Sequence, residues 1–211
     1  MTPLRRRRLK ELRSGYRERR GPIRKRLEDF RAVPPAEVVY ELFYCLLTPQ
    51  SSAANAGRAI EKIRAAGCAA DPRRTAEILR NREHYIRFHN TKALRIERAW
   101  LSFPALEGLL QQRLSGEVLR SWLVANVPGL GWKESSHFLR NIGYRDLAIL
   151  DRHILRNLHA HGVIRRIPTS LTPKRYLSIE QAFRRFARRL KIPMDELDLL
   201  FWSRETGEIL K

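Results

Sequence analysis

The sequence predicts an all-α protein. Its apolar residues recur at helical spacing, and no stretch alternates apolar with polar residues as a half-buried strand would. Capping residues, prolines and glycines divide the 211 residues into segments of ordinary helix length. With 43% hydrophobic and 30% charged residues, the composition is globular and provides one sizeable core or two small lobes.

Prolines and capping residues delimit the first three expected helices. Residues 8–31 carry an irregular apolar stripe among many arginines, and this helix ends before Pro34, because proline disfavours helix at its own position and at the one before it. Residues 36–47 are almost wholly apolar, so we expect a buried helix there. Ser51 can cap a third helix, which closes at Gly67.

The next four helices are indicated by the same signals. Asp71 caps a helix that has Pro72 in its first turn and extends to about residue 80. An apolar stripe over 91–102 predicts the following helix. Pro104 is expected to open a short helix that reaches residue 112, and Ser115 to open another that reaches about residue 125.

A tight turn at Val127–Gly131 separates these helices from the last four. A helix is expected at 132–141 directly after the turn, and another from Asp151 to about residue 161. Thr172 caps a long amphipathic helix that ends near residue 190, and Pro193 starts a final helix that ends near residue 202.

The net charge is +20, because 42 Lys and Arg residues outweigh 22 Asp and Glu residues. A charge of this size favours a polyanionic partner, and nucleic acid is the first candidate. No apolar run is long enough to cross a bilayer, and the arginines near the N-terminus lack the apolar stretch of a secretory signal. We therefore expect a cytoplasmic protein without a membrane partner, associated with the nucleoid if the cell is prokaryotic.

The turn at Val127, Gly129 and Gly131 joins two expected helices. Its backbone N–H groups would lie beside the positive N-terminus of the following helix, an arrangement that binds phosphate without recognising a base. The simpler alternative is a tight interhelical turn with no ligand. The high positive charge favours the phosphate site.

Lys133 and Asp151 follow this turn and can perform a definite reaction. The chain has 34 arginines and 8 lysines, so a retained lysine suggests a need for an amine, which can lose its proton and attack. A carboxylate near a sugar can stabilise the positive charge that develops as a base departs. The alternative is that Lys133 contacts phosphate and Asp151 caps a helix.

These residues resemble a known superfamily. Val127–Gly131, with Lys133 and Asp151, is similar to the helix–hairpin–helix DNA glycosylases. Within the superfamily, the chain resembles one family, the type 2 8-oxoguanine DNA glycosylase/AP lyases, over about Ala36 to the C-terminus. The matching residues are Leu47–Ser51, Arg87–Asn90, Lys133–Arg156 and Lys211.

The resemblance implies a role for each matched residue. Lys133 would be the Schiff-base nucleophile and Asp151 its electrostatic partner. Gln50 would fill the hole left by the extruded base, Phe88 and Trp202 would stack on that base, and Lys211 at the chain end would help distinguish 8-oxoguanine from guanine. Val127, Gly129 and Gly131 would contact the DNA backbone. The second stacking residue stays open between Phe88, His89 and another neighbour.

The resemblance also implies a two-lobed architecture. We expect a basic N-terminal helix (1–32) that packs with a C-terminal lobe (146–211), and a helical barrel that contains the hairpin (33–145). An iron–sulfur cluster of the kind found in some superfamily members is excluded, because no cysteine follows Cys68. The reaction needs no cofactor or metal. His159 and His161 lie two positions apart on a helix and diverge, so no metal pair is expected.

The expected function is therefore excision of 8-oxoguanine from double-stranded DNA by a monomer, followed by cleavage of the abasic site. Two alternatives stay open. The same scaffold could act on another lesion, such as an oxidised pyrimidine. The chain could also be a non-enzymatic nucleic-acid-binding protein that uses the hairpin only to contact the backbone.

Overall fold

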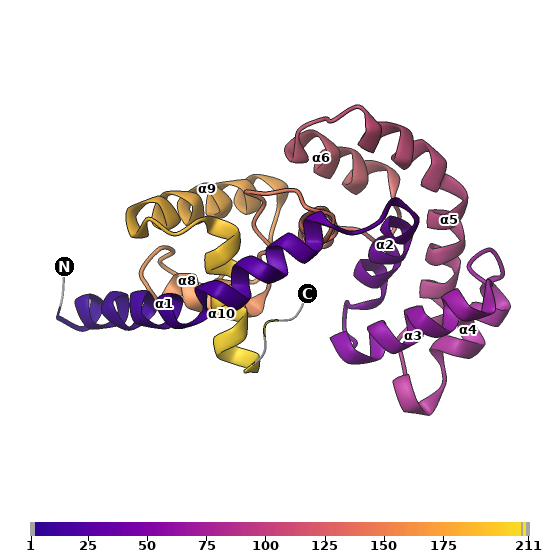
Figure 1. Cartoon of the computed structure of the whole chain (residues 1–211), viewed down its shortest axis with the longest axis horizontal. Helices are drawn as coiled ribbons and strands as arrows, with labels where there is room; N and C mark the ends of the chain where they lie inside the picture. Colours follow the sequence, from indigo (N-terminus) through magenta and orange to yellow (C-terminus); the bar gives the residue numbers. More distant parts are fainter. Residues whose placement is uncertain (1–2, 208, 210–211) are drawn as a thin grey trace. The chain divides into compact units, whose positions relative to one another are not determined.

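The computed structural model describes residues 3–207 and 209, and every regular element within them is a helix, which confirms the all-α prediction (Figure 1). The α-helices are α1 (Pro3–Arg31), α2 (Val38–Leu47), α3 (Ala53–Ala66), α4 (Pro72–Leu79), α5 (His89–Gln111), α6 (Gly116–Asn126), α7 (Trp132–Asn141), α8 (Arg152–Ala160), α9 (Pro173–Leu190) and α10 (Met194–Thr206). Two 3₁₀ turns, η1 (Pro35–Glu37) and η2 (Arg82–His84), precede α2 and α5.

The chain divides into two compact units. The central unit is Val33–Ile142, and the terminal unit combines Met1–Ala32 with Gly143–Lys211. Each unit has its own buried apolar residues, as a separate core requires.

The central unit is organised around α2, which contacts α3, α5 and α7. Its residues from Glu41 to Leu47 are all buried, in agreement with the expectation of a buried helix at 36–47. Glu41 is the polar member of this run, and its Oε2 accepts a hydrogen bond from Asn141 Nδ2 of α7 at 3.0 Å. A helix that is apolar all round needs neighbours on every side, so α2 fixes the positions of the surrounding helices.

The terminal unit is organised around α10, which contacts α1, α8 and α9 (Figure 1). The basic helix α1 packs across α10 and buries an apolar stripe that includes Leu12 and Ile23 (Figure 1). Polar contacts reinforce this packing, because Arg19 donates to the backbone oxygen of Ser203 at 2.8 Å and Tyr16 Oη donates to Glu196. The many arginines of α1 thus surround a stripe that is buried against α10.

Two expected helix starts are wrong in detail. Pro104 does not open a helix but lies inside α5, which continues through it, because a proline removes one intrahelical hydrogen bond and need only kink a long helix. The cap of α3 is Ser52, whose Oγ accepts from Asn55 N at 3.0 Å, and not Ser51. Ser51 Oγ instead accepts from Arg87 N at 3.1 Å, a partner distant in sequence.

Gly143, the first residue after the central unit, has a φ of 95°, and a Cβ there would lie 3.1 Å from Arg31 Cα. We expect Gly143→Ala to lower the free energy of unfolding by about 1–3 kcal/mol, because alanine strains this backbone. Denaturant titration measures the change. The control is Gly57→Ala in α3, where a Cβ meets nothing within 4 Å and alanine should stabilise the helix. Equal stability of Gly143→Ala and wild type would contradict the prediction.

Candidate active site

The predicted helix–hairpin–helix is present in the central unit, between α6 and α7. Leu130 N donates to Val127 O at 3.2 Å and closes the turn, and Gly129 has a φ of 100°. A Cβ at Gly129 would lie 2.6 Å from Cδ of Arg95, which packs against the turn from α5. The positive φ is what favours glycine at this position, because the flexible Arg95 side chain can move away from a Cβ.

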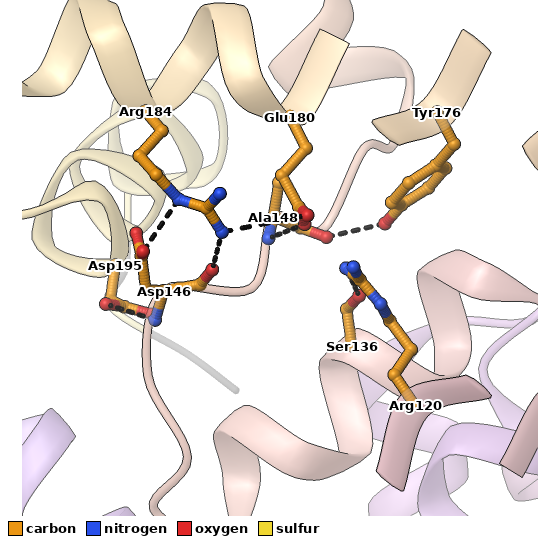
Figure 2. A network of polar contacts seen from close by, with 8 residues as sticks. All are labelled: Arg120, Ser136, Asp146, Ala148, Tyr176, Glu180, Arg184 and Asp195. Carbon is orange, nitrogen blue, oxygen red and sulfur yellow. Dashed lines mark hydrogen bonds and ion pairs between the residues drawn. The ribbon is translucent and has the colours of Figure 1, made fainter. Parts of the chain in front are cut away.

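A buried arginine joins the two helices of the hairpin. Arg120 of α6 is 1% exposed and donates from Nη1 to Ser136 Oγ of α7 at 3.2 Å (Figure 2). Its guanidinium also lies 5.0 Å from the ring centroid of Trp132, the first residue of α7. These contacts fix the angle at which α7 leaves the turn, and with it the direction of the α7 N-terminus.

The N-terminus of α7 has no side-chain cap. Gly131 occupies the capping position and makes no side-chain hydrogen bond, so the first backbone N–H groups of α7 have no partner supplied in this way. Uncapped N–H groups and the helix dipole together attract an anion. The geometry of the turn therefore suits a phosphate group, and phosphate binding stays a prediction.

Lys133 is the second residue of α7, two positions beyond Gly131. Its Nζ lies 3.1 Å from Glu134 Oε1, and 30% of its side chain is exposed. Lys133 thus lies next to the uncapped helix end, with its side chain partly exposed.

The buried residue Cys45 of α2 lies near enough for the charge of Lys133 to act on it. Burial raises the pKa of this thiol, which therefore stays protonated and unreactive.

Asp151 caps α8 in the terminal unit. Its Oδ1 accepts a hydrogen bond from Ile154 N at 2.8 Å, and its side chain is half-buried. The capping role that the sequence left as an alternative is therefore real. It is compatible with the electrostatic role, because a carboxylate fixed by a cap keeps its negative charge in one orientation.

Three side chains of α9 bind the irregular segment that leads to Asp151 (Figure 2). Tyr176, Glu180 and Arg184 are four residues apart and so lie on one face of the helix. Tyr176 Oη donates to the backbone oxygen of Ala148 at 2.5 Å, and Glu180 Oε2 accepts from Ala148 N at 2.8 Å. Arg184 Nη2 donates to the backbone oxygen of Asp146 at 2.8 Å.

Further contacts hold both ends of this segment. Leu150 N, directly before Asp151, donates to Tyr176 Oη at 3.3 Å. At the other end Asp146 has a φ of 63°, and its N–H donates to both carboxylate oxygens of Asp195 at 3.1 Å. Burial raises the pKa of Asp195, and the hydrogen bond from Asp146 N opposes that shift. The backbone before the catalytic candidate is thus fixed by buried polar groups.

Gln50 and Phe88 lie on two turns of the central unit that contact each other. Both have a left-handed backbone, with φ of 57° and 59°, which is uncommon for residues other than glycine. The Gln50 side chain is exposed, and the Phe88 ring is 50% exposed beneath the Arg87 guanidinium, 4.9 Å from its centroid. The hydrogen bond from Arg87 N to Ser51 Oγ joins the two turns. Strained, exposed residues of this kind are typical of ligand sites.

Trp202 lies on α10, in the same unit as Asp151. It is half-buried, and its ring centroid lies 5.5 Å from that of His153 on α8. His153 Nδ1 in turn lies 3.5 Å from Glu205 Oε2. This contact depends on the packing of α8 against α10, two helices that are distant in sequence. No local signal could have found it, since α8 and α10 are separated by α9.

The remaining predicted site residue, Lys211, lies outside the described residues. Among residues 3–207 and 209, no group of three His, Cys, Asp or Glu side chains is arranged to hold a metal ion. None of the helices in this part of the chain is long and apolar enough to span a membrane.

Comparison with known proteins identifies the family. A model of the family described as 8-oxoguanine DNA glycosylase matches residues 23–192, most of both units. The chain belongs to this glycosylase family. One curated relative is the 8-oxoguanine DNA glycosylase/AP lyase of Fusobacterium nucleatum subsp. nucleatum, which is 36% identical over 220 residues that cover 95% of this chain and 96% of that protein.

Crystal structures of two glycosylases have the same fold. The 8-oxoguanine DNA glycosylase of Thermotoga maritima is 33% identical to this chain, and the two structures match with a TM-score of 0.88. The match covers 98% of this chain and 100% of that one. The second structure is the 8-oxoguanine glycosylase/lyase of Methanocaldococcus jannaschii in complex with a 15mer DNA containing 8-oxoguanine. It is 32% identical to this chain, and the structures match with a TM-score of 0.83 over 95% of this chain and 100% of that one. The predicted helix–hairpin–helix glycosylase fold is confirmed.

We expect Tyr176→Phe to lower the free energy of unfolding by about 1–2 kcal/mol, because the backbone groups of Ala148 and Leu150 lose a buried partner. Amide hydrogen exchange should show faster exchange at Leu150. The control is Tyr144→Phe, because the Tyr144 hydroxyl bonds to no described residue. Unchanged protection of Leu150 would show that the Tyr176 hydroxyl does not fix this segment.

Proposed function

We propose that the chain is a bifunctional DNA repair enzyme that excises 8-oxoguanine and then cleaves the abasic site by β-elimination. The observation that carries this assignment is the match of the 8-oxoguanine DNA glycosylase family to residues 23–192, with Lys133 at the uncapped start of α7. A purely structural hairpin would not need an amine at this position, and the chain uses arginine for most of its positive charge.

In the first step the uncharged Lys133 amine attacks C1′ of the damaged nucleotide. The new C–N bond forms as the bond from C1′ to the base breaks, and the base leaves with its electron pair. Asp151 stabilises the positive charge that develops on the sugar. The nitrogen then gives up one proton to O4′ as the C1′–O4′ bond breaks, which opens the sugar ring and gives a protonated Schiff base between Lys133 Nζ and C1′. Loss of a proton from C2′ then expels the 3′ phosphate, which breaks the strand.

Base recognition requires the nucleotide to leave the helical stack. We assign stacking on the extruded base to Phe88 and Trp202, and filling of the vacated space to Gln50. The exposed Phe88 ring and the exposed Gln50 side chain on adjacent turns support this assignment. Lys211, as the chain end, is assigned to the distinction between 8-oxoguanine and guanine.

DNA binding is assigned to the hairpin and to the positive charge of the chain. Backbone groups of Val127, Gly129 and Gly131 would contact phosphates of double-stranded DNA, and the +20 charge would add a salt-dependent attraction. The chain acts as a monomer on the nucleoid. No step in this reaction calls for a metal or an organic cofactor.

Borohydride trapping tests the nucleophile. Wild type incubated with an 8-oxoguanine duplex and reduced should give a covalent protein–DNA band, and Lys133→Gln should give none while duplex binding persists. Lys62→Gln, an exposed lysine of α3, is the control. An undiminished band from Lys133→Gln would refute the assignment. A set of duplexes with oxidised pyrimidines tests which lesion is the substrate. Stronger trapping on one of them than on 8-oxoguanine would identify that pyrimidine as the substrate instead.

Asp151→Asn tests the electrostatic role separately from the fold. Asparagine caps helices as well as aspartate, so α8 should stay intact. Loss of the negative charge should slow base excision by about 10²–10³-fold in single-turnover assays. Circular dichroism and thermal unfolding check that the variant is folded. Excision at the wild-type rate by a folded variant would exclude Asp151 from this role.

A further inference from the structure

One buried lysine is not used by the proposed reaction. Lys92, in the first turn of α5, is 2% exposed, and its ammonium donates three hydrogen bonds within the central unit. Nζ lies 2.7 Å from the backbone oxygen of Leu47, 2.7 Å from that of Pro49 and 3.3 Å from Ser51 Oγ. These three acceptors surround Gln50 in the sequence.

The environment of Lys92 explains how an ammonium is retained in the interior. Burial lowers the pKa of Lys92 to about 8, with nearby Arg95 as a second cause. Leu47 is the last residue of α2, so its carbonyl has no intrahelical partner and lies at the negative end of the helix dipole. Lys92, a residue of α5, therefore supplies the hydrogen bond that the last carbonyl of α2 lacks, and this requires burial of its charge.

The backbone of the same residue binds the second turn. Lys92 N donates to the backbone oxygen of Phe88 at 3.0 Å, which is the first intrahelical bond of α5 and places Lys92 one turn after Phe88. Ser51 Oγ, which accepts from Lys92 Nζ, also accepts from Arg87 N. A single residue thus contacts both sides of the pair of turns that present Gln50 and Phe88. Both turns have a strained left-handed backbone, which persists only where its surroundings fix it.

We propose that Lys92 is a positioning residue for base extrusion, whose ammonium holds the Gln50 turn in a fixed relation to the start of α5 and the Phe88 turn. This proposal rests on the assignment of Gln50 and Phe88 to the extruded nucleotide. Lys92 does not touch the DNA and does not act as a nucleophile, because three oxygens of the protein enclose its amine.

The step at which Lys92 acts defines the test. Excision of 8-oxoguanine requires extrusion of a base, whereas β-elimination at a preformed abasic site does not. Lys92→Met keeps a long, unbranched side chain and removes all three hydrogen bonds. We expect single-turnover excision to slow by about 10²-fold, the size of effect that a displacement of about 1 Å produces. Elimination at a preformed abasic site should stay close to the wild-type rate.

Borohydride trapping on the abasic duplex counts the active molecules, so both rates are expressed per active enzyme. A 2-aminopurine beside the lesion reports extrusion directly, and its fluorescence should rise more slowly with Lys92→Met than with wild type. The matched control is Lys62→Met, which removes an exposed lysine of the same unit and should leave both rates unchanged.

Ser51→Ala keeps the test decisive if Lys92→Met does not fold. This change removes the oxygen that joins Lys92 and Arg87 without burying or deleting a charge, and it should slow excision more than elimination. Equal slowing of both rates per active enzyme, or excision at the wild-type rate, would overturn the proposal. A failure of the proposed function can be told apart from a failure of this proposal, because in the former case the wild-type protein itself would release no 8-oxoguanine.

Discussion

Unpaired backbone groups at helix ends are the constraint on which the candidate site depends. Gln50 follows α2, Phe88 precedes α5 and Asp151 precedes α8, so each lies where N–H and C=O groups lack an intrahelical partner. Buried side chains of other helices supply the missing hydrogen bonds. Lys92 does so after α2, and Tyr176 with its neighbours on α9 does so before α8. Irregular backbone fixed in this way can present side chains to a ligand without the freedom of an ordinary loop.

The hairpin differs from these turns because its helix end is left open. Gly131 gives α7 no side-chain cap, so the N–H groups at the start of this helix suit an anion from outside the protein. The turn itself is nevertheless rigid, since Arg120 joins α6 to α7 and Arg95 fills the space beside Gly129. Because Arg95 and Lys92 are on α5, the first two turns of this helix connect the hairpin to the turns of Gln50 and Phe88. The central unit thus places its candidate DNA contacts on one framework.

Local signals gave the helices and most of the site candidates, and their failures have a common origin. The capping role of Asp151 was recognised, because it follows from the position of this residue directly before α8, and its electrostatic role stays a prediction. The capping signal at Ser51 was misplaced by one residue, since Ser51 is occupied by Arg87 and Lys92, which lie far away in sequence. The contact of His153 with Trp202 depends on the packing of α8 against α10 and has no local signal in the sequence. Pro104 was expected to open a helix, and the packing of α5 overrode that preference.

By itself, the sequence determined the helical class, the hairpin with its glycines and the positive charge, and it singled out Lys133 and Asp151 as candidates. Each is encoded in residues close together along the chain or in the composition as a whole. Only the tertiary structure decided what fixes the irregular segments: the buried ammonium of Lys92 below the Gln50 turn and the face of α9 beside the segment before Asp151. These partners are separated from their targets by 26 to 45 residues. Hydrogen bonds over such separations leave no periodic pattern in the sequence, since they depend on how whole helices pack.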